Sequence, residues 1–326
     1  MPSSYEARSF YLSIYVLAIL TGLPTNLLAL HALVKKLRTK ATPNSILLFN
    51  LTLSDLIFLA FLPFKVSEQF VGHWALPLFL CPLSGLLYFS TIYTSTLFLT
   101  AVSVERYLGV AYPIHYRLRR HLVYVVVASL SLWTCCFGHC SIVYITEFHP
   151  YNFSPPVNFS NDLCYRNFTN EQLTILLPVR LELGIVLFLV PSLITCFCYF
   201  SFMRIVISSA HIRKSKKQRA VGLVAATLTI FIICFSPYNI SHVVGFIKWE
   251  SPEWRDEALI PSTFSASLDP IIFYFSSSAV QRSCWNFLSW AKRIFTLPSL
   301  IHKVFFGKTP SLRRPSPQES ICSSKL

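Results

Sequence analysis

The sequence predicts an all-α membrane protein, a bundle of seven transmembrane helices followed by a short amphipathic eighth helix. The 326 residues are 53% hydrophobic and only 13% charged, about half the roughly 25% charge of an ordinary soluble domain. Mean hydropathy is +0.53. The basic residues behind the net charge of +14 stand in short clusters between long apolar runs. These observations exclude a soluble enzyme, a disordered chain and a nucleic-acid-binding protein.

Seven apolar runs are long enough to cross a bilayer, whose hydrocarbon core of about 30 Å needs about 20 helical residues. They lie at about 10–34, 44–68, 78–110, 121–146, 174–207, 219–247 and 257–277. Strands of a β-barrel would be about ten residues long and would alternate in polarity, which these runs do not. We therefore expect an extracellular N-terminus at 1–9, a seven-helix domain at 10–278, an amphipathic helix at 279–295 and a cytoplasmic tail at 296–326.

Lysine and arginine set the orientation, because loops rich in these residues stay in the cytoplasm. Most of the 28 Lys and Arg residues follow the first, third and fifth runs or lie in the tail. The first run is too long for the core of a cleavable signal peptide, and we interpret it as a signal anchor. We expect a multi-pass plasma-membrane protein with its N-terminus outside and its C-terminus inside.

The long outer loop at about 147–173 has the features of an extracellular segment. Asn152, Asn158 and Asn167 each begin an N-x-S/T sequon and are candidate glycosylation sites. Most of the ten cysteines lie inside the runs, where free thiols pack as small apolar groups. Cys81 and Cys164 fall on the outer, oxidising side. We predict that they form a disulfide that holds this loop across the mouth of the bundle.

Polar residues inside the runs discriminate among seven-helix proteins, because an ionisable group costs about 2.5–3.5 kcal/mol or more at mid-bilayer. A retinal pump would need a lysine in the last run, which has none. The remaining pattern consists of Gly22 and Asn26, L-T-L-S-D at 51–55, E-R-Y at 105–107, Trp133, Pro191 and Tyr199, C-F-S-P at 234–237 and D-P-I-I-F at 269–273. In this order and at these depths, it resembles a rhodopsin-like G-protein-coupled receptor. Phe235 and Phe273 depart from the tryptophan and tyrosine usual in that family.

The resemblance implies a heterotrimeric G protein as the cytoplasmic partner. Arg106 would be the switch that Glu105 holds at rest and the G protein takes over in the active state. Tyr107 and Tyr199 belong to the same group of switch residues. The alternative for Arg106 is a simple surface ion pair with Glu105.

Three polar residues inside the runs form a predicted cluster, Asn26, Asp55 and Asp269. We expect this cluster to favour the resting state and consider a sodium ion at Asp55 as its candidate occupant. The alternative is that the three residues only provide buried hydrogen bonds between helices.

The outer half of the bundle carries basic groups that would bind an anion. An amine receptor needs an acid in the outer part of the third run, which reads L-L-Y-F-S-T-I-Y and has none. Arg180, His242 and His139 lie in the fifth, sixth and fourth runs, and Arg255 stands at the mouth of the seventh. Pairing of Arg180 with Glu182 is disfavoured, because residues two apart on a helix do not face each other. A solvated loop position for Arg255 and a core position for each histidine remain alternatives.

Four segments carry a more specific likeness: F-G-H-C at 137–140, L-P-V-R-L-E-L at 177–183, S-P-Y-N-I-S-H at 236–242 and S-L-D-P-I-I-F-Y-F-S-S-S at 267–278. They resemble the free fatty acid receptors, above all the short-chain types 2 and 3. The likeness implies a short-chain carboxylate ligand (acetate, propionate or butyrate). It also implies a site with Arg180, Arg255 and His242 at the carboxylate and His139, Tyr93, Tyr165 and Tyr238 around a short cavity. Arg166 departs from the pattern, which has a neutral or acidic residue there.

Ligand size predicts a weak sensor. Acetate has four heavy atoms and gains at most about −6 kcal/mol at a ceiling near −1.5 kcal/mol per atom, equivalent to a Kd of tens of micromolar at best. The resemblance implies coupling to inhibitory G proteins, with phospholipase-linked G proteins as a second class. We expect no enzymatic activity and no cofactor. The alternatives are a receptor for another small carboxylate, such as lactate or a hydroxy acid, and, more remotely, a monocarboxylate transporter.

The tail is expected to contact membrane lipid and arrestin. Residues 279–295 set Arg and Lys residues against Phe287, Leu288 and Trp290, an amphipathic pattern typical of a helix on the inner leaflet. Cys284 is a candidate for palmitoylation. Serines in the last residues of the chain are candidate phosphorylation sites that would recruit arrestin.

Overall fold

The computed structural model describes residues 4–118, 122–147, 164–166, 168–276, 285 and 289. The chain divides into a first unit, Met1–Ser283, and a second unit, Cys284–Leu326. Two residues of the second unit are described, and they are helical, with the Ser289 hydroxyl donating to the Trp285 carbonyl oxygen at 2.7 Å. The rest of the predicted amphipathic helix, Cys284 and the sequon residues Asn152, Asn158 and Asn167 lie outside the described residues.

The described part of the first unit is helical. Its elements in chain order are α1 (Ser4–Lys40), α2 (Pro43–Val71), α3 (Leu80–Ala111), α4 (Pro113–Leu118), α5 (Leu122–Glu147), α6 (Asn170–Leu183), the π-helix η2 (Gly184–Leu189), α7 (Val190–Ser208), α8 (Lys214–Lys248) and α9 (Arg255–Ser276). Within the described residues, six helical segments are long and apolar enough to cross a membrane, and they coincide with the first six predicted runs. The seventh run corresponds to α9.

Helix α9 turns polar residues into the protein. It begins with Arg255, Asp256 and Glu257, and it buries Thr263 and Asp269 completely. It contacts α1, α2 and α8. The hydroxyls of Thr263 and of Tyr88 in α3 lie 3.1 Å apart.

Polar caps fix where two helices begin. Thr42 and Ser45 form a reciprocal capping box at the start of α2, and Pro43 occupies the first helical position. α2 ends at Gly72, whose φ of 89° is costly for a residue with a side chain. Thr169 and Gln172 form the same box at the start of α6, so the outer end of α6 is defined four residues before the predicted run begins at 174.

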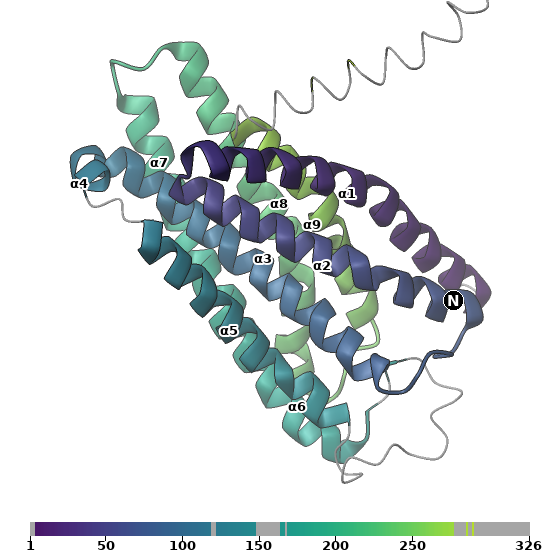
Figure 1. Ribbon diagram of the computed structural model, residues 1–326. Helices are drawn as coiled ribbons and strands as arrows, with labels where there is room; N and C mark the ends of the chain where they lie inside the picture. Colours follow the sequence, from purple (N-terminus) through teal and green to yellow (C-terminus); the bar gives the residue numbers. More distant parts are fainter. Residues whose placement is uncertain are drawn as a thin grey trace, which may run out of the picture. The chain divides into compact units, whose positions relative to one another are not determined.

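Helix α3 is the centre of the bundle. It contacts α2, α5, α7 and α8, and Figure 1 shows α1, α2, α3 and α5 side by side. The indole nitrogen of Trp133 in α5 donates to Asn50 Oδ1 in α2 at 2.9 Å, while the Trp133 ring lies 5.9 Å from the ring of Phe98 in α3. α9 closes the bundle by packing against α1 on one side and α8 on the other.

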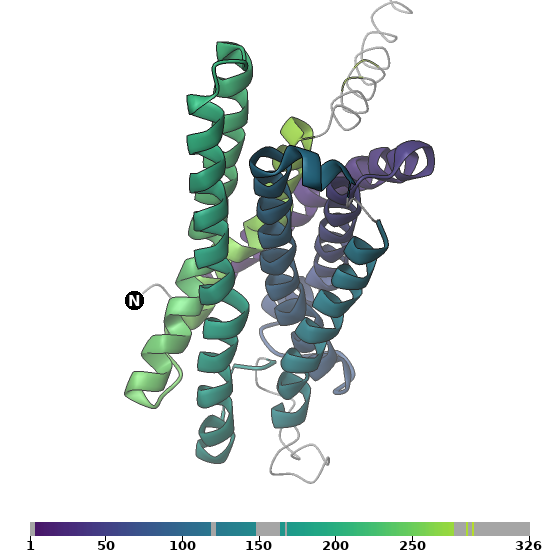
Figure 2. The same ribbon diagram turned by 90° about the vertical axis from the view of Figure 1, so that its left-hand side faces the viewer.

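The fifth predicted span is one continuous column of α6, η2 and α7 beside α8 (Figure 2). The π-helical turn, which the sequence analysis did not predict, directly precedes Pro191. Proline has no N–H, and its ring would clash with the carbonyl group four residues earlier. The chain accommodates this by widening the turn, so that the Val190 N–H donates to the Ile185 carbonyl oxygen, five residues back. The same turn places Gly184 opposite Asn239 and His242 of α8.

Candidate ligand-binding site

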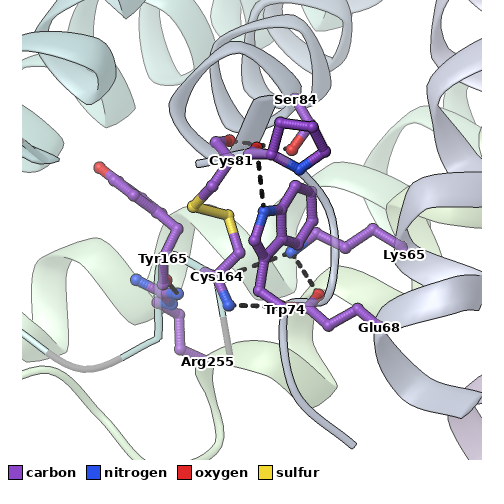
Figure 3. The surroundings of a disulfide bond; sticks show 9 residues. Lys65, Glu68, Trp74, Cys81, Ser84, Cys164, Tyr165 and Arg255 are labelled. Carbon is purple, nitrogen blue, oxygen red and sulfur yellow. Dashed lines mark hydrogen bonds and ion pairs between the residues drawn. A yellow bond between two sulfur atoms is a disulfide. The ribbon is translucent and has the colours of Figure 1, made fainter. Parts of the chain in front are cut away.

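The outer loop is anchored to two helices at the mouth of the bundle (Figure 3). Cys164 forms the predicted disulfide with Cys81 at the start of α3, with a Cα–Cα distance of 5.6 Å. The Cys164 N–H donates to Glu68 Oε1 in α2. Lys65 Nζ donates to Glu68 Oε2 at 2.9 Å and to the Cys164 carbonyl oxygen at 3.4 Å. The loop is therefore fixed by a covalent bond and by a buried carboxylate.

Tyr165 follows the disulfide in a left-handed conformation, with φ of 61°, which is uncommon for a bulky residue. Its ring lies 5.3 Å from the ring of Phe89 and 4.9 Å from the ring of Phe168. Its carbonyl oxygen accepts a hydrogen bond from Arg255 Nη2 at 3.0 Å. The disulfide and this bond hold the backbone in that conformation and bury the ring beneath the loop.

Arg180 of α6 and Arg255 of α9 are both buried, with 4% and 5% of their surface exposed. The two guanidinium groups lie over the same Phe168 ring, at 4.8 and 5.4 Å from its centroid. Arg180 Nη1 donates to Ser251 at 3.4 Å. Within the described part of the chain, Arg180 Nη2 and Arg255 Nη1 are buried without a hydrogen-bond partner. Two buried cations with free donors are costly to keep unless an anion joins them.

The structure rules out the two plain alternatives for these arginines. Burial shows that Arg255 is not a solvated loop residue. The carboxylate of Glu182 lies on the His139 ring, at 3.3 Å from Nε2, so Glu182 is directed to α5. Arg180 and Glu182 therefore lie on different faces of α6, and Arg180 is the buried one.

His242 is held in a buried polar group on α8. Its Nε2 lies 3.1 Å from the Tyr93 hydroxyl, which also donates to Asn239 Oδ1 at 3.4 Å. The Tyr238 ring packs edge-on against His242 at 4.4 Å and stacks on Phe89 at 5.8 Å. His242 lies within electrostatic reach of both arginines. The structure thus brings Arg180, Arg255, His242 and the three predicted tyrosines into one region.

His139 is placed differently from the other predicted ligand residues. Its ring pairs with Glu182 and contacts the Cys135 carbonyl oxygen at 2.9 Å. The side chains of His139 and Glu182 are 39% and 45% exposed, on the outward side of the seam between α5 and α6. In this structure the His139 side chain therefore pairs with Glu182 and not with the buried arginines.

A small cavity of about 60 Å³ lies beside Arg255, beneath the outer loop. Its walls come from α1, α2, α3, α9 and the loop, and they include Tyr15, Lys65, Tyr88, Phe89 and Tyr165. Arg166 and Asp256 line it as well, whereas Arg180 does not. The cavity therefore adjoins one of the two cations and mixes aromatic with charged walls.

Several residues of this region were not predicted from the sequence. Phe168 supports both arginines, Ser251 accepts from Arg180, and Glu68 anchors the loop. A loop residue such as Phe168 gives no periodic signal. Asn239 was noted only as a sequon inside a span, although a buried amide there was itself a signal of a polar site.

Toward the end of the bundle opposite the disulfide, α3 and α7 meet through the predicted switch residues. Arg106 Nη1 donates to the Tyr199 hydroxyl at 3.3 Å, and the guanidinium lies 5.9 Å from the Tyr199 ring centroid. The Tyr107 ring packs edge-on against Phe197 of α7. Glu105 precedes Arg106 in α3.

The predicted polar cluster lies where α1, α2 and α9 meet. Asn26 Nδ2 donates to the Ala266 carbonyl oxygen at 2.7 Å, and Asp55 and Asp269 lie within electrostatic reach of each other. Four buried acceptors have no hydrogen-bond partner in the described chain: Asn26 Oδ1, Asp55 Oδ2 and both carboxylate oxygens of Asp269. Such a set of oxygens fits a hard cation. The described residues contain no group of three or more His, Cys, Asp or Glu side chains that could hold a metal ion.

Comparison with known proteins gives one consistent result. Residues 25–285 match the model of the 7 transmembrane receptor (rhodopsin family). The chain is 45% identical to free fatty acid receptor 3 of Mus musculus, over 97% of this chain and all of that protein. It is 49% identical to free fatty acid receptor 2 of Mus musculus, over 84% of each. Free fatty acid receptor 1 of Mesocricetus auratus is 33% identical over 80% of this chain and 89% of that protein.

The likeness covers nearly the whole chain. It identifies a multi-pass plasma-membrane receptor, with a small-molecule ligand and a G protein as partners, and not an enzyme. Identities to types 2 and 3 are too similar to separate the two. The chain belongs to the free fatty acid receptors, within the rhodopsin family of seven-transmembrane receptors.

Proposed function

We propose that this receptor responds to short-chain carboxylic acids (acetate, propionate and butyrate) and that their carboxylate binds between Arg180 and Arg255. The observation that carries the proposal is the pair of buried guanidinium groups over one Phe168 ring, each with a nitrogen that has no hydrogen-bond partner in the described part of the chain. A guanidinium presents a planar fork of donors that matches the two oxygens of a carboxylate. His242 contributes one further hydrogen bond, and Tyr93, Tyr165 and Tyr238 surround the ligand.

The covered position of the two arginines supports a short chain. Tyr165 and Phe168 lie over both guanidinium groups, and the cavity beside Arg255 is small and does not extend to Arg180. A longer acid would need the loop or the aromatic walls to move, because the disulfide and Glu68 hold the loop in place.

The signal passes from the outer site to Arg106, where the G protein binds on the cytoplasmic face. We assign coupling to inhibitory G proteins, with phospholipase-linked G proteins as a second class. The N-terminus is extracellular, because most Lys and Arg residues then lie in the cytoplasm. The proposal also includes arrestin, which would bind the phosphorylated tail, and membrane lipid, which would contact residues 279–295. Cys284 would carry a palmitoyl group, and the outer-loop sequons would carry glycans.

The polar cluster is proposed to hold a sodium ion in the resting state. Asp55 and Asp269 would supply the charge, and Asn26 Oδ1 would supply a neutral oxygen. Binding there favours the conformation in which the helices converge on the ion, so sodium and agonist would oppose each other.

A cyclic-AMP dose–response in cells tests the ligand proposal. Arg255→Ala is expected to abolish the response to propionate while reaching the cell surface normally. Lys248→Ala, which removes an exposed cation at the outer end of α8, is the matched control and should respond like the parent. A normal response by Arg255→Ala would place the carboxylate elsewhere.

Two further measurements test the alternative functions. Lactate and hydroxy acids in the same assay identify a receptor for another small carboxylate if they act at lower concentrations than propionate. Radiolabelled propionate should not accumulate in cells that express the protein, and accumulation would indicate a transporter.

Coupling is tested by Arg106→Ala. This variant should bind propionate nearly as well as the parent but should not signal, because Arg106 acts on the effector side. A modest loss of affinity is consistent with the reciprocity of coupled sites. Unchanged signalling by a variant at normal surface density would remove the switch assignment.

A further inference from the structure

Arg166, the loop residue that departs from the family pattern, lies beside the carboxylate site. Its Nε is 3.4 Å from Asp256 Oδ2. The other oxygen of the same carboxylate, Oδ1, is 3.4 Å from Arg255 Nη2. Exposure falls along this chain of three charges, from 53% for the Arg166 side chain to 31% for Asp256 and 5% for Arg255. It therefore connects the surface to one of the buried cations.

Asp256 competes with the ligand for Arg255. A carboxylate ligand and the Asp256 carboxylate both need donors on Arg255, and Asp256 is always present. Arg255 Nη2 is already shared between Asp256 and the Tyr165 carbonyl oxygen, which leaves Nη1 for the ligand. A second negative charge nearby also repels an incoming anion.

We propose that Arg166 is a positioning residue that holds Asp256 away from full pairing with Arg255 and so keeps Arg255 available to the ligand. The inference rests on the proposed binding of a carboxylate between Arg180 and Arg255. The net charge of the group explains the effect. Arg180, Arg255, Arg166 and Asp256 together carry two positive charges, and removal of Arg166 leaves one. Asp256 then pairs more fully with Arg255, and the attraction for a carboxylate is weakened but not abolished.

The effect is moderate because Arg166 and Asp256 are partly in water, where exposed ion pairs are screened. We expect Arg166→Gln to raise the propionate concentration for half-maximal response by about threefold to tenfold, and tenfold corresponds to about 1.4 kcal/mol. Because the change acts at the carboxylate, acetate and butyrate should shift equally. A change in cavity shape would instead affect the two acids differently.

Arg166 has a competing direct role, since it lines the cavity and could attract anions by its own charge. A double-mutant cycle separates the two roles. Asp256→Asn removes the competing charge with little change of shape and should lower the half-maximal concentration. In that background, adding Arg166→Gln should change nothing. Arg166→Lys, which keeps a cation beside Asp256, should recover part of the loss.

All variants are measured at matched surface density in cyclic-AMP assays, with Lys248→Gln as the control for loss of an outer cation. If Asp256→Asn does not reach the surface, Asp256→Ala provides the second removal of the carboxylate. An equal loss from Arg166→Gln with and without Asp256 would overturn the proposal in favour of direct attraction. Arg180→Ala distinguishes the failures: if it still responds, the carboxylate site is wrong, and if it is silent while Arg166→Gln has no effect, only the Arg166 inference is wrong.

Discussion

The outer and inner parts of the bundle each bury a pair of like charges, and the two pairs have opposite sign. Among the described residues, Arg180 and Arg255 each have a donor nitrogen without a partner, whereas Asp55 and Asp269 have acceptor oxygens without partners. The outer pair lies beside the loop that carries Cys164 and Tyr165, and the inner pair lies where α1, α2 and α9 meet.

The chemistry of the side chains separates these two regions further. A buried carboxylate can take up a proton and become neutral, so Asp55 and Asp269 have a way to relieve their repulsion without any ligand. A guanidinium stays protonated in proteins, so Arg180 and Arg255 can be relieved only by an anion. The outer pair is therefore a site that needs a ligand, while the inner pair is a site that a cation or a proton can occupy.

The largest expected effect comes from the identity of the outer cations. Arg180→Ala should cost the ligand about 2–4 kcal/mol, because the carboxylate loses a desolvated partner. At a starting affinity of about 0.1–1 mM, this moves the propionate response beyond usable concentrations. Arg180→Lys should fail almost as completely, since an ammonium is a point charge and lacks the planar fork of donors. Cyclic-AMP dose–response at matched surface density measures both.

Recovery of most of the response by Arg180→Lys would contradict the fork geometry. The site would then need positive charge alone, and the two regions would differ only in sign. Lys248→Ala serves again as the control, because it changes the charge at the outer end of α8 without touching the site.

A smaller effect is expected at the inner pair. Sodium should raise the half-maximal propionate concentration of the parent by about tenfold, equivalent to about 1.4 kcal/mol of coupling. Asp55→Asn should remove most of this sodium dependence, because one carboxylate of the pair is lost while the helix surface keeps its shape. Replacing sodium by potassium at constant ionic strength tests this in membranes, with the parent as reference.

If Asp55→Asn keeps the full sodium effect, sodium does not bind at Asp55. The buried carboxylate oxygens of Asp55 and Asp269 would then be satisfied by a proton or by an internal donor. Surface expression is measured for each variant. Asp269→Asn removes the other carboxylate of the pair and replaces Asp55→Asn in the test if that variant does not reach the surface. Ionic strength itself should not distinguish parent from variant.

The spans could be predicted from the sequence because bilayer thickness and apolar run length decide them. The predicted run at 174–207 matches the column from α6 to α7 closely. What could not be predicted is how α6 is turned about its axis. The π-turn before Pro191 inserts about one residue, and one residue corresponds to about 100° of rotation at 3.6 residues per turn. Arg180 and Glu182 lie about 200° apart around the helix, so a rotation of about 100° turns both away from the faces they would otherwise occupy, and packing against α8 decides which one points inward.

The outer loop shows a different limit of the sequence. The disulfide followed from the location of Cys81 and Cys164, but the ring contacts of Tyr165 and Phe168 with the arginines did not. Tyr165 reaches Arg255 only because its backbone has a φ of 61°, and no periodic pattern encodes that conformation. The family likeness therefore named Tyr165 as a candidate ligand-binding residue, but the position of its ring could be learned only from the structure.

Two histidines that the sequence placed at the same site should differ in effect, and the smallest effect of all is expected at His139. His242 is buried beside Tyr93, within electrostatic reach of the arginines, and His242→Ala should cost about 1–2 kcal/mol, consistent with one hydrogen bond to a charged group. His139 pairs with Glu182 on the outward side of α5, and half-exposed pairs contribute little. His139→Ala should therefore shift the propionate response by less than about twofold. Propionate binding to membranes that contain each variant, together with the dose–response of both variants, measures the difference. An effect of His139→Ala as large as that of His242→Ala, with Glu182→Gln silent, would mean that the His139 ring turns inward when the ligand binds.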